Sequence, residues 1–233
     1  MVKENLMEVE SRVQAACERA GRPREDVLLI AVSKTKPVEL IREIMETGTK
    51  DFGENKVQEM CNKIEEIREP LNWHLIGHLQ RNKVKYIVDK AYLIHSVDSL
   101  RLAEEIQKEA VKKNVSKVPV LIEVNMAQEA SKDGINASET EELVREIAKL
   151  PNVQIRGLMT IAPFVDDPEE NRVHFRAMRE LRDHLKAMNI PGVEMKELSM
   201  GMTNDFEVAI EEGATMIRVG TAIFGERNYA VEA

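Results

Sequence analysis

Short apolar segments alternate with amphipathic segments along the sequence, and this alternation is the feature that most limits how the chain can fold. Val27–Ser33 is a continuous run of β-favouring residues, which is typical of a strand buried on both faces. Pro37 and Gly48 then bracket a helical period, as expected at the first turn and the end of a helix. The pair repeats, so eight strands are predicted. They span residues 27–33, 51–53, 73–78, 92–96, 118–125, 155–161, 197–200 and 216–223.

Strands that alternate with helices pair in parallel through right-handed crossovers. Eight such strands predict an α/β fold, a (β/α)8 TIM-type barrel. An open doubly wound sheet is the alternative, but no Gly-x-Gly-x-x-Gly follows the first strand. An additional N-terminal helix at about 2–20 is expected to take the place of a helix after the eighth strand. Without a linker or low-complexity segment, residues 1–233 are predicted to form one domain.

Composition excludes several classes of protein. The 41 acidic and 33 basic residues give a net charge of −8, which argues against a nucleic-acid partner. The two cysteines, Cys17 and Cys61, are expected to be reduced interior thiols rather than a disulfide framework. No apolar run reaches the roughly 20 residues needed to span a membrane. The N-terminus lacks the apolar region of a signal peptide, so a cytoplasmic location is expected.

A lysine pair follows the first strand, at the end where barrels carry their functional residues. Lys34 or Lys36, placed beside the low-dielectric interior, can have its ammonium pKa lowered by desolvation. A neutral amine can condense with an aldehyde to form a Schiff base. Strand parity places both lysines on the same face, so spacing does not choose between them. The alternative is a solvated lysine that leaves the strand.

Glycines and hydroxyl side chains follow the last two strands, where barrels commonly bind phosphate. Glycine lets an anion approach the backbone N–H groups, and Thr203 is predicted to be the N-cap of a helix at 204–212. An ordinary turn and cap is the alternative for each segment alone. The candidate phosphate-binding residues are Ser199, Gly201, Thr203, Gly220 and Thr221.

Three other polar positions are candidates at the strand ends. Arg218 suits a ring nitrogen or a carboxylate at the barrel mouth, with a salt bridge as the alternative. Asn55 follows the second strand and offers an amide near Lys34. His74 and His78 are predicted to share a strand face, where hydrogen bonding or ring stacking is expected. A zinc site needs three or four ligands, so no metal is predicted.

The sequence resembles the pyridoxal 5′-phosphate (PLP) homeostasis protein family, stand-alone relatives of the alanine racemase N-terminal barrel, over nearly its whole length. The matching segments are AVSKTKP (31–37), FGENKVQE (52–59), WHLIGHLQ (73–80), IHSV (94–97), EASKDG (129–134), RGLM (156–159), SMGM (199–202) and RVGTAIFG (218–225). The resemblance implies that Lys34 is the Schiff-base lysine, that Arg218 faces the pyridine nitrogen and that Asn55 lies near the ring. It also implies that the glycines and hydroxyls named above surround the phosphate. Lys56 stands where many members carry Tyr, and Thr203 where many carry Ser.

The function implied by this resemblance is storage of PLP and its supply to PLP-dependent apo-enzymes by a monomeric, non-catalytic protein. An arginine facing the pyridine nitrogen weakens the electron sink that PLP enzymes use. No segment supplies the second acid/base that a racemase needs. The alternatives are a single-domain amino-acid racemase with weak activity and a Schiff-base aldolase acting on a sugar phosphate. Lys132, in the loop before Gly134, is expected at the pocket edge or in water.

Overall fold

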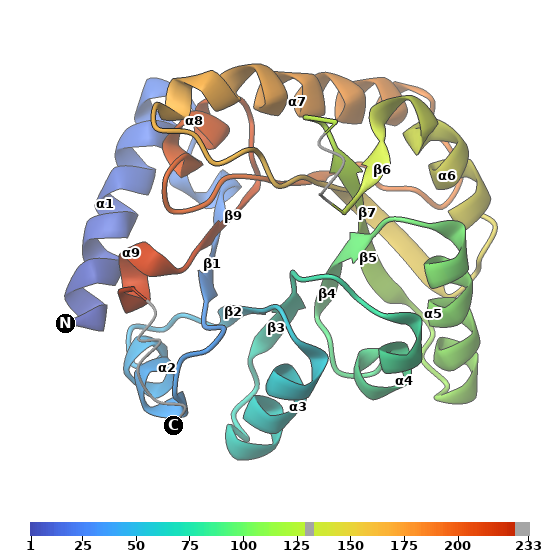
Figure 1. Cartoon of the computed structure of the whole chain (residues 1–233), viewed down its shortest axis with the longest axis horizontal. Coiled ribbons are helices and arrows are strands. Elements are labelled where there is room, and N and C mark those ends of the chain that lie inside the picture. Colours follow the sequence, from blue (N-terminus) through green and yellow to red (C-terminus); the bar gives the residue numbers. More distant parts are fainter. Residues whose placement is uncertain (129–132, 227–233) are drawn as a thin grey trace.

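Eight parallel strands close into a barrel in the computed structural model (Figure 1), which describes residues 1–128 and 133–226. The barrel strands are β1 (Leu28–Val32), β2 (Asp51–Glu54), β3 (Asn72–Leu75), β4 (Leu93–Val97), β5 (Val118–Asn125), β7 (Val153–Met159), β8 (Glu197–Ser199) and β9 (Met216–Val219). Their order around the barrel is β4-β3-β2-β1-β9-β8-β7-β5, and β5 pairs back onto β4 to close the ring. The predicted barrel is confirmed.

The eight strands lie at the predicted places, but some of their ends differ; β3, for example, ends at Leu75 rather than at residue 78. β9 ends at Val219 rather than continuing to residue 223, and the helix α9 (Thr221–Phe224) follows it. The reason is the turn at Gly220, whose carbonyl accepts hydrogen bonds from the amides of Ile223 and Phe224. The short strand β6 (Ile135–Asn136) was not predicted; it pairs in parallel with the end of β5.

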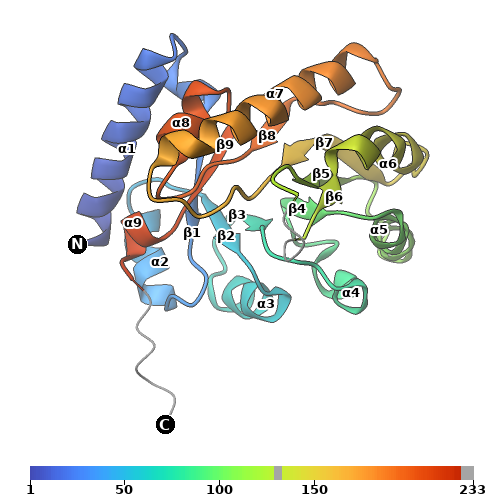
Figure 2. The same ribbon diagram turned by 45° about the horizontal axis from the view of Figure 1, so that its top comes forward.

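A layer of helices surrounds the barrel (Figures 1 and 2). The remaining helices are α1 (Val2–Arg19), α2 (Val38–Met45), α3 (Val57–Glu66), α4 (Val84–Ile87), α5 (Leu100–Lys112), α6 (Thr140–Ile147), α7 (Arg172–Ala187) and α8 (Phe206–Glu211). α1 buries its apolar face against α8, α9 and α2. It therefore takes the place in the outer layer that was expected for it, although the eighth strand also has its own short helix.

Two groups of apolar side chains hold the fold together. The larger one fills the space between the strands and the helical layer, and Cys17 and Cys61 are buried free thiols within it. The smaller one comes from alternate strand positions that face the barrel interior, as strand parity requires. It consists of Ile30, Leu93, Leu121, Met159 and Met216. Within residues 1–128 and 133–226, every helix is too short or too polar to cross a bilayer.

Candidate functional site

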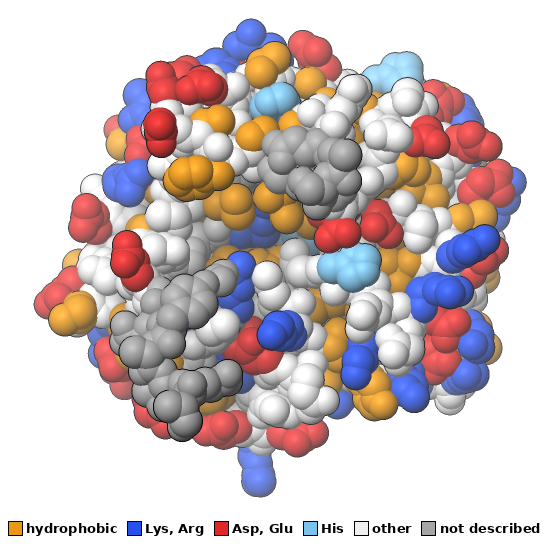
Figure 3. Space-filling view, viewed as in Figure 1, with side chains coloured by type: hydrophobic (Ala, Val, Ile, Leu, Met, Phe, Trp, Pro, Cys, Tyr) orange, Lys and Arg blue, Asp and Glu red, His pale blue; other side chains and the backbone are white. Residues whose placement is uncertain are grey.

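Four neighbouring strands bring the predicted site residues to one end of the barrel. Lys34 follows β1, Asn55 follows β2, Ser199 ends β8, and Arg218 lies in β9. β1 pairs with β2 on one side and with β9 on the other, and β9 pairs with β8. Because all four strands are parallel, their carboxyl ends meet at the same mouth. Figure 3, in the view of Figure 1, shows this molecule hollowed near the middle of the ring of strands.

Lys34 lies in a tight turn directly after β1 and is half-buried. The turn is closed by a hydrogen bond from the amide of Lys36 to the carbonyl oxygen of Ser33. Thr35 adopts a φ of 62°, a left-handed conformation that is costly for a β-branched residue. Its amide donates a hydrogen bond of 2.5 Å to Oε1 of Glu59 in α3. The turn is therefore imposed by its surroundings rather than by its own conformational preference.

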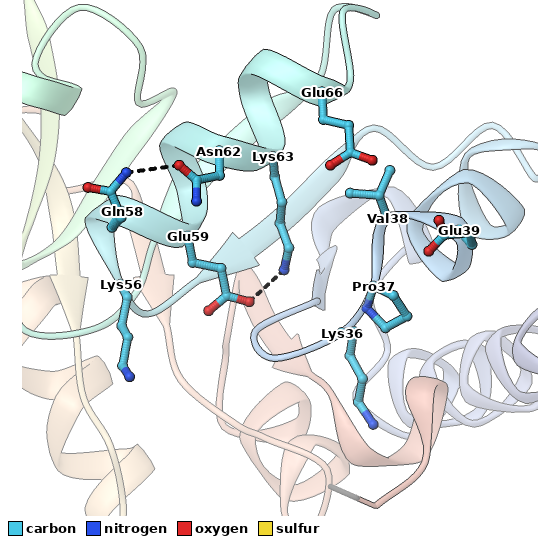
Figure 4. A pocket seen from close by; sticks show the side chains of 10 residues that line it. All are labelled: Lys36, Pro37, Val38, Glu39, Lys56, Gln58, Glu59, Asn62, Lys63 and Glu66. Carbon is cyan, nitrogen blue, oxygen red and sulfur yellow. Dashed lines mark hydrogen bonds and ion pairs between the residues drawn. The ribbon is translucent and has the colours of Figure 1, made fainter. Parts of the chain in front are cut away.

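A buried charge cluster lies beneath this turn. Nζ of Lys63 donates to Oε1 of Glu54 at 2.7 Å and to Oε1 of Glu59 at 2.8 Å. It also donates to the carbonyl oxygen of Ser33 at 2.7 Å, and the Ser33 hydroxyl donates to Glu54. Burial raises the pKa of Glu54, and the charge of Lys63 opposes this rise. Figure 4 shows the side chains of Lys63 and Glu59, four residues apart on α3, joined by this contact.

Lys36 is held at the end of α9, and the parity argument does not apply to the lysine pair. Nζ of Lys36 donates to the carbonyl oxygens of Phe224, Gly225 and Glu226, at the end of α9. Parity fails because the chain leaves the extended conformation after Ser33. Lys36 also borders a cavity of about 560 Å³ between α2 and α3, shown in Figure 4, whose lining does not include Lys34.

Arg218 is a buried cation at the centre of the candidate site, with a side chain only 3% exposed. Its Nη1 donates to Oγ of Ser199 at 2.6 Å, and its Nη2 donates to the carbonyl oxygen of Thr160 at 2.9 Å. Burial lowers the pKa of Arg218 to about 10, while the carboxylates of Glu123 and Asp205 act in the opposite direction. The guanidinium remains charged at neutral pH and has no direct carboxylate partner among the hydrogen bonds of the described residues.

The segments after β8 and β9 contact each other, as a shared anion site requires. The amide of Ala222, in the first turn of α9, lies 3.4 Å from Oγ1 of Thr203. Gly201 has a φ of +94°, and a Cβ there would lie 2.6 Å from Cβ of Ala209, so only glycine fits this close approach. The carbonyl oxygen of Gly201 accepts from the amide of Arg218. The five predicted phosphate residues thus lie on two adjoining segments.

The predicted capping role of Thr203 is wrong. α8 begins at Phe206, not at residue 204, and Asp205 is its N-cap residue. Oδ1 of Asp205 accepts a hydrogen bond from the amide of Met202 at 2.8 Å. A carboxylate that binds the preceding loop delays the start of the helix and leaves the Thr203 hydroxyl directed at α9.

Asn55 is half-buried where β2 meets α3. The loop after β3 passes close to the backbone of Asn55. A Cβ added at Gly77 in this loop would lie only 2.4 Å from the Asn55 carbonyl oxygen. Lys56, the next residue, is exposed at the start of α3. Lys132 lies outside the described residues.

The two histidines predicted to share a face of the third strand are separated. β3 ends at Leu75, so His78 lies in an exposed loop, 3.4 Å from Oδ1 of Asp133. His74 is fully buried and hydrogen-bonded to His95, so the hydrogen bonding expected for it is confirmed. His78, Asp98 and Asp133 place one possible ligand atom each within 4.8 Å of one another.

The structure brings further polar residues close to Arg218 and Lys34. Glu123 is 4% exposed, and its pKa is raised to about 7 by burial and by the carboxylates of Asp133 and Asp98. Lys63 and Glu59 read as an ordinary i, i+4 surface pair on a helix, and nothing in their spacing reveals burial. His95 makes two hydrogen bonds inside the barrel, to His74 and to Ser199.

Known proteins resemble this chain along almost its entire length. The model of the alanine racemase N-terminal domain family matches residues 5–228. A protein of Aquifex aeolicus named pyridoxal phosphate homeostasis protein is 51% identical over 227 residues, covering 97% of this chain and 98% of the relative. PipY of Synechococcus elongatus PCC7942, solved with PLP bound, has a TM-score of 0.83 and 36% identity, covering 97% of this chain and 100% of PipY.

Alanine racemase of Corynebacterium glutamicum shares the fold at 15% identity. Its TM-score is 0.70, with 96% of this chain and 63% of the racemase covered. The family match and the similarity to curated relatives both extend over almost the whole barrel. The chain therefore belongs to the alanine racemase N-terminal domain family, together with the proteins named pyridoxal phosphate homeostasis protein.

Proposed function

We propose that this chain binds PLP at the carboxyl ends of β8, β9, β1 and β2, holds it as an imine with Lys34, and serves in PLP homeostasis. The relatives carry that name at 38–51% identity, and PipY has been solved with PLP bound. When bound, PLP supplies an aldehyde that a primary amine can capture reversibly. Lys34 is the amine that we assign to this capture.

The observation that carries the proposal is the placement of Arg218. Its guanidinium is buried inside the barrel, on the strand between the one that leads to Lys34 and the one that leads to Gly201. A guanidinium has only N–H donors, so it suits an unprotonated pyridine nitrogen.

The donor set for the opposite end of the cofactor also fits. The loops after β8 and β9 offer the hydroxyls of Thr203 and Thr221 and the amides around Gly220. A phosphate group needs several N–H and O–H donors and a close approach to the backbone, which glycine permits. We assign the ring contact to Asn55 and the phosphate contacts to Gly201, Thr203, Gly220 and Thr221. Ser199, whose Oγ is hydrogen-bonded to Arg218 and His95, is assigned to the ring end of the cofactor site.

We propose a storage and supply role rather than turnover of a substrate. Racemisation would need a second proton donor at the barrel mouth. The tyrosines of the described residues lie elsewhere. Tyr92 lies before β4, at the opposite end of the barrel, and packs against His74. Tyr86 is exposed on α4, where Lys83 and Lys85 lie over its ring. Tyr229 lies outside the described residues. PLP-dependent apo-enzymes are the proposed recipients, and a monomer is the proposed state.

The direct test is to titrate the purified protein with PLP, reduce it with borohydride and map the modified peptide by mass spectrometry. We expect a visible absorption band that disappears on reduction and one phosphopyridoxyl group on Lys34. Lys34→Met should abolish the covalent adduct. The matched control is Lys36→Met, two residues away, which should retain it because Lys36 binds the end of α9. Labelling of a different lysine in the wild type would overturn the assignment.

Catalysis is tested separately on the PLP-loaded protein. Incubation with L-alanine, followed by circular dichroism, should show no sustained loss of optical activity. Steady racemisation at a rate proportional to protein concentration, and absent in Lys34→Met, would replace the homeostasis role with that of a racemase.

A further inference from the structure

A chain of hydrogen bonds crosses the barrel interior from Arg218 to Asp51. From Ser199 Oγ, which accepts from Arg218 at 2.6 Å, it runs to Nδ1 of His95 at 2.9 Å. Nε2 of His95 lies 2.9 Å from Nδ1 of His74, and Nε2 of His74 lies 3.0 Å from Oδ1 of Asp51. His74, His95 and Ser199 have no exposed surface. Four strands, β9, β8, β4 and β3, and the first residue of β2 supply the members.

The two ends of the chain give it a direction. Arg218 can only donate, so Oγ of Ser199 accepts from it, which leaves the Ser199 proton available to Nδ1 of His95. His95 then carries its proton on Nε2 and donates to Nδ1 of His74. His74 in turn donates from Nε2 to the carboxylate of Asp51, which can only accept. In this pattern both histidines are neutral and each of the four hydrogen bonds has one proton.

The surroundings of the chain favour the same pattern. Burial lowers the pKa of His95 well below its usual value, and His74 and Arg218 add to this effect. Oδ1 of Asp51 also accepts from Nδ2 of Asn72 at 3.0 Å, which supports its role as the acceptor end. The rings of His74 and His95 meet edge to face, with centroids 5.1 Å apart, so neither ring can turn without breaking two hydrogen bonds.

We propose that Asp51, His74, His95 and Ser199 form a directional hydrogen-bond chain that fixes the guanidinium of Arg218 toward the ring nitrogen of bound PLP. Asp51, His74 and His95 are therefore positioning residues for a cofactor that they do not touch. The inference rests on the proposed function for the identity of the ligand. The hydrogen-bond chain, in contrast, is present in the protein without a ligand.

The consequence for the site is a donor of fixed orientation. Arg218 donates one N–H to Ser199 and another to Thr160, so its remaining N–H groups point in defined directions. A ring nitrogen opposite such a cation is held as an acceptor and is not protonated. Hydrogen bonds in a buried network polarise one another, so loss of one member loosens its neighbours. Removing any member of the hydrogen-bond chain should therefore affect the orientation of the Arg218 guanidinium.

The first test uses the wild-type protein without PLP. Long-range ¹H–¹⁵N correlation spectra at pH 7 report which nitrogen of each histidine carries a proton. We expect both His74 and His95 to be neutral with the proton on Nε2. A protonated imidazolium at either position, or a proton on Nδ1 of His95, would overturn the proposed direction. This measurement does not depend on how any variant folds.

The second test compares variants that cut the chain with a matched control. Ser199→Ala removes the link to Arg218, and His95→Gln breaks the middle of the chain. Ser96→Ala is the control, because Ser96 is also buried in β4 but its Oγ has no partner among the described residues. In the spectra of the PLP-free protein, the Nη protons of Arg218 should be separate in the wild type and in Ser96→Ala. They should be averaged in the two chain variants.

The same variants are then titrated with PLP. Losing a hydrogen bond to a charged group should weaken PLP binding by about tenfold in Ser199→Ala and His95→Gln, and leave it unchanged in Ser96→Ala. With ¹⁵N-labelled PLP, the ring-nitrogen resonance should move only in the two chain variants. Unchanged Arg218 and ring-nitrogen signals in both chain variants would overturn the positioning role.

Failure of this inference is distinguishable from failure of the proposed function. Borohydride labelling of Lys34 reports on PLP capture and is independent of the chain. If Lys34 is labelled but the histidine tautomers differ from those expected, the proposed function stands and the directional hydrogen-bond chain is rejected. If the expected tautomers are found but borohydride labels no lysine, the hydrogen-bond chain is established and PLP is rejected as the ligand of the site.

Discussion

Nζ of Lys63 lies 2.7 Å from the carbonyl oxygen of Ser33, the residue that precedes Lys34. This buried ammonium also compensates the carboxylates of Glu54 and Glu59. Lys63→Met should therefore lower the free energy of unfolding by about 3–5 kcal/mol, because it leaves buried charge unpaired. It should also slow or weaken PLP capture by Lys34. Chemical denaturation and PLP titration measure the two effects.

The matched control for this variant is Lys56→Met, on the exposed start of the same helix. Its free energy of unfolding should change by less than about 0.5 kcal/mol. In the double variant Lys63→Met with Glu54→Gln, part of the lost stability should return, since the buried charge is removed with its partner. Equal stability of Lys63→Met and the wild type would show that the cluster does not hold the turn.

Gly77 brings the loop after β3 against the backbone of Asn55. In Gly77→Ala the new Cβ would lie 2.4 Å from the carbonyl oxygen and 2.7 Å from Cα of Asn55, so that segment must move. We expect a loss of about 1–3 kcal/mol in the free energy of unfolding and weaker PLP binding. Gly48→Ala is the comparison, since Gly48 has a φ of +89° and open space around it. It should lose stability and keep PLP affinity, as measured by thermal unfolding and titration.

Thr203 offers a hydroxyl at the contact between the two proposed phosphate segments. Thr203→Val keeps the shape of the side chain and removes only the polar atom. We expect PLP binding to weaken by about ten- to hundredfold, the value of one hydrogen bond to a charged group. Thr203→Ser should retain the affinity. Pyridoxal, which lacks the phosphate, should bind both variants and the wild type alike. A similar loss for pyridoxal would place Thr203 elsewhere in the site.

The sequence predicted the barrel well because its determinants are local. Each strand is a short apolar run such as Val27–Ser33, bounded by helix-starting and helix-ending residues, and eight repeats leave few ways to pair. The differences arise where one local interaction changes the path of the backbone. Examples are the turn at Gly220, which ends β9 early, and the Asp205 carboxylate, which moves the start of α8.

The site was predicted only in part, for a related reason. Residues at strand ends can be found from their positions in the chain, as Arg218 was. The lysine pair could not be resolved by parity, because the chain turns after Ser33 and carries Lys36 to α9. Lys63 and His95 each have a hydrogen-bond partner more than 20 positions away in the sequence. Their burial depends on how the closed barrel brings these strands and helices together, and no short sequence pattern encodes it.

Glu123 faces the candidate site with a pKa raised to about 7, mainly through burial and then through Asp133 and Asp98. The folded protein thus binds a proton that the unfolded chain, with a carboxyl pKa near 4.5, releases. Stability should therefore fall as the pH rises from 4.5 to about 7 and then stay constant for this group. Above pH 7, ionisation of Glu123 lowers the free energy of unfolding by about 3 kcal/mol relative to its value at low pH.

Glu123→Gln removes this cost without changing the size of the side chain. At pH 8 the variant should exceed the wild type in free energy of unfolding by about 3 kcal/mol, and at pH 4.5 the two should be nearly equal. The lowered pKa of His95 makes stability fall as the pH drops below 6.5, but this slope is common to both proteins and cancels in the difference. Urea denaturation at a series of pH values gives the comparison. A difference that does not depend on pH would mean that Glu123 is ionised in the folded protein throughout this range.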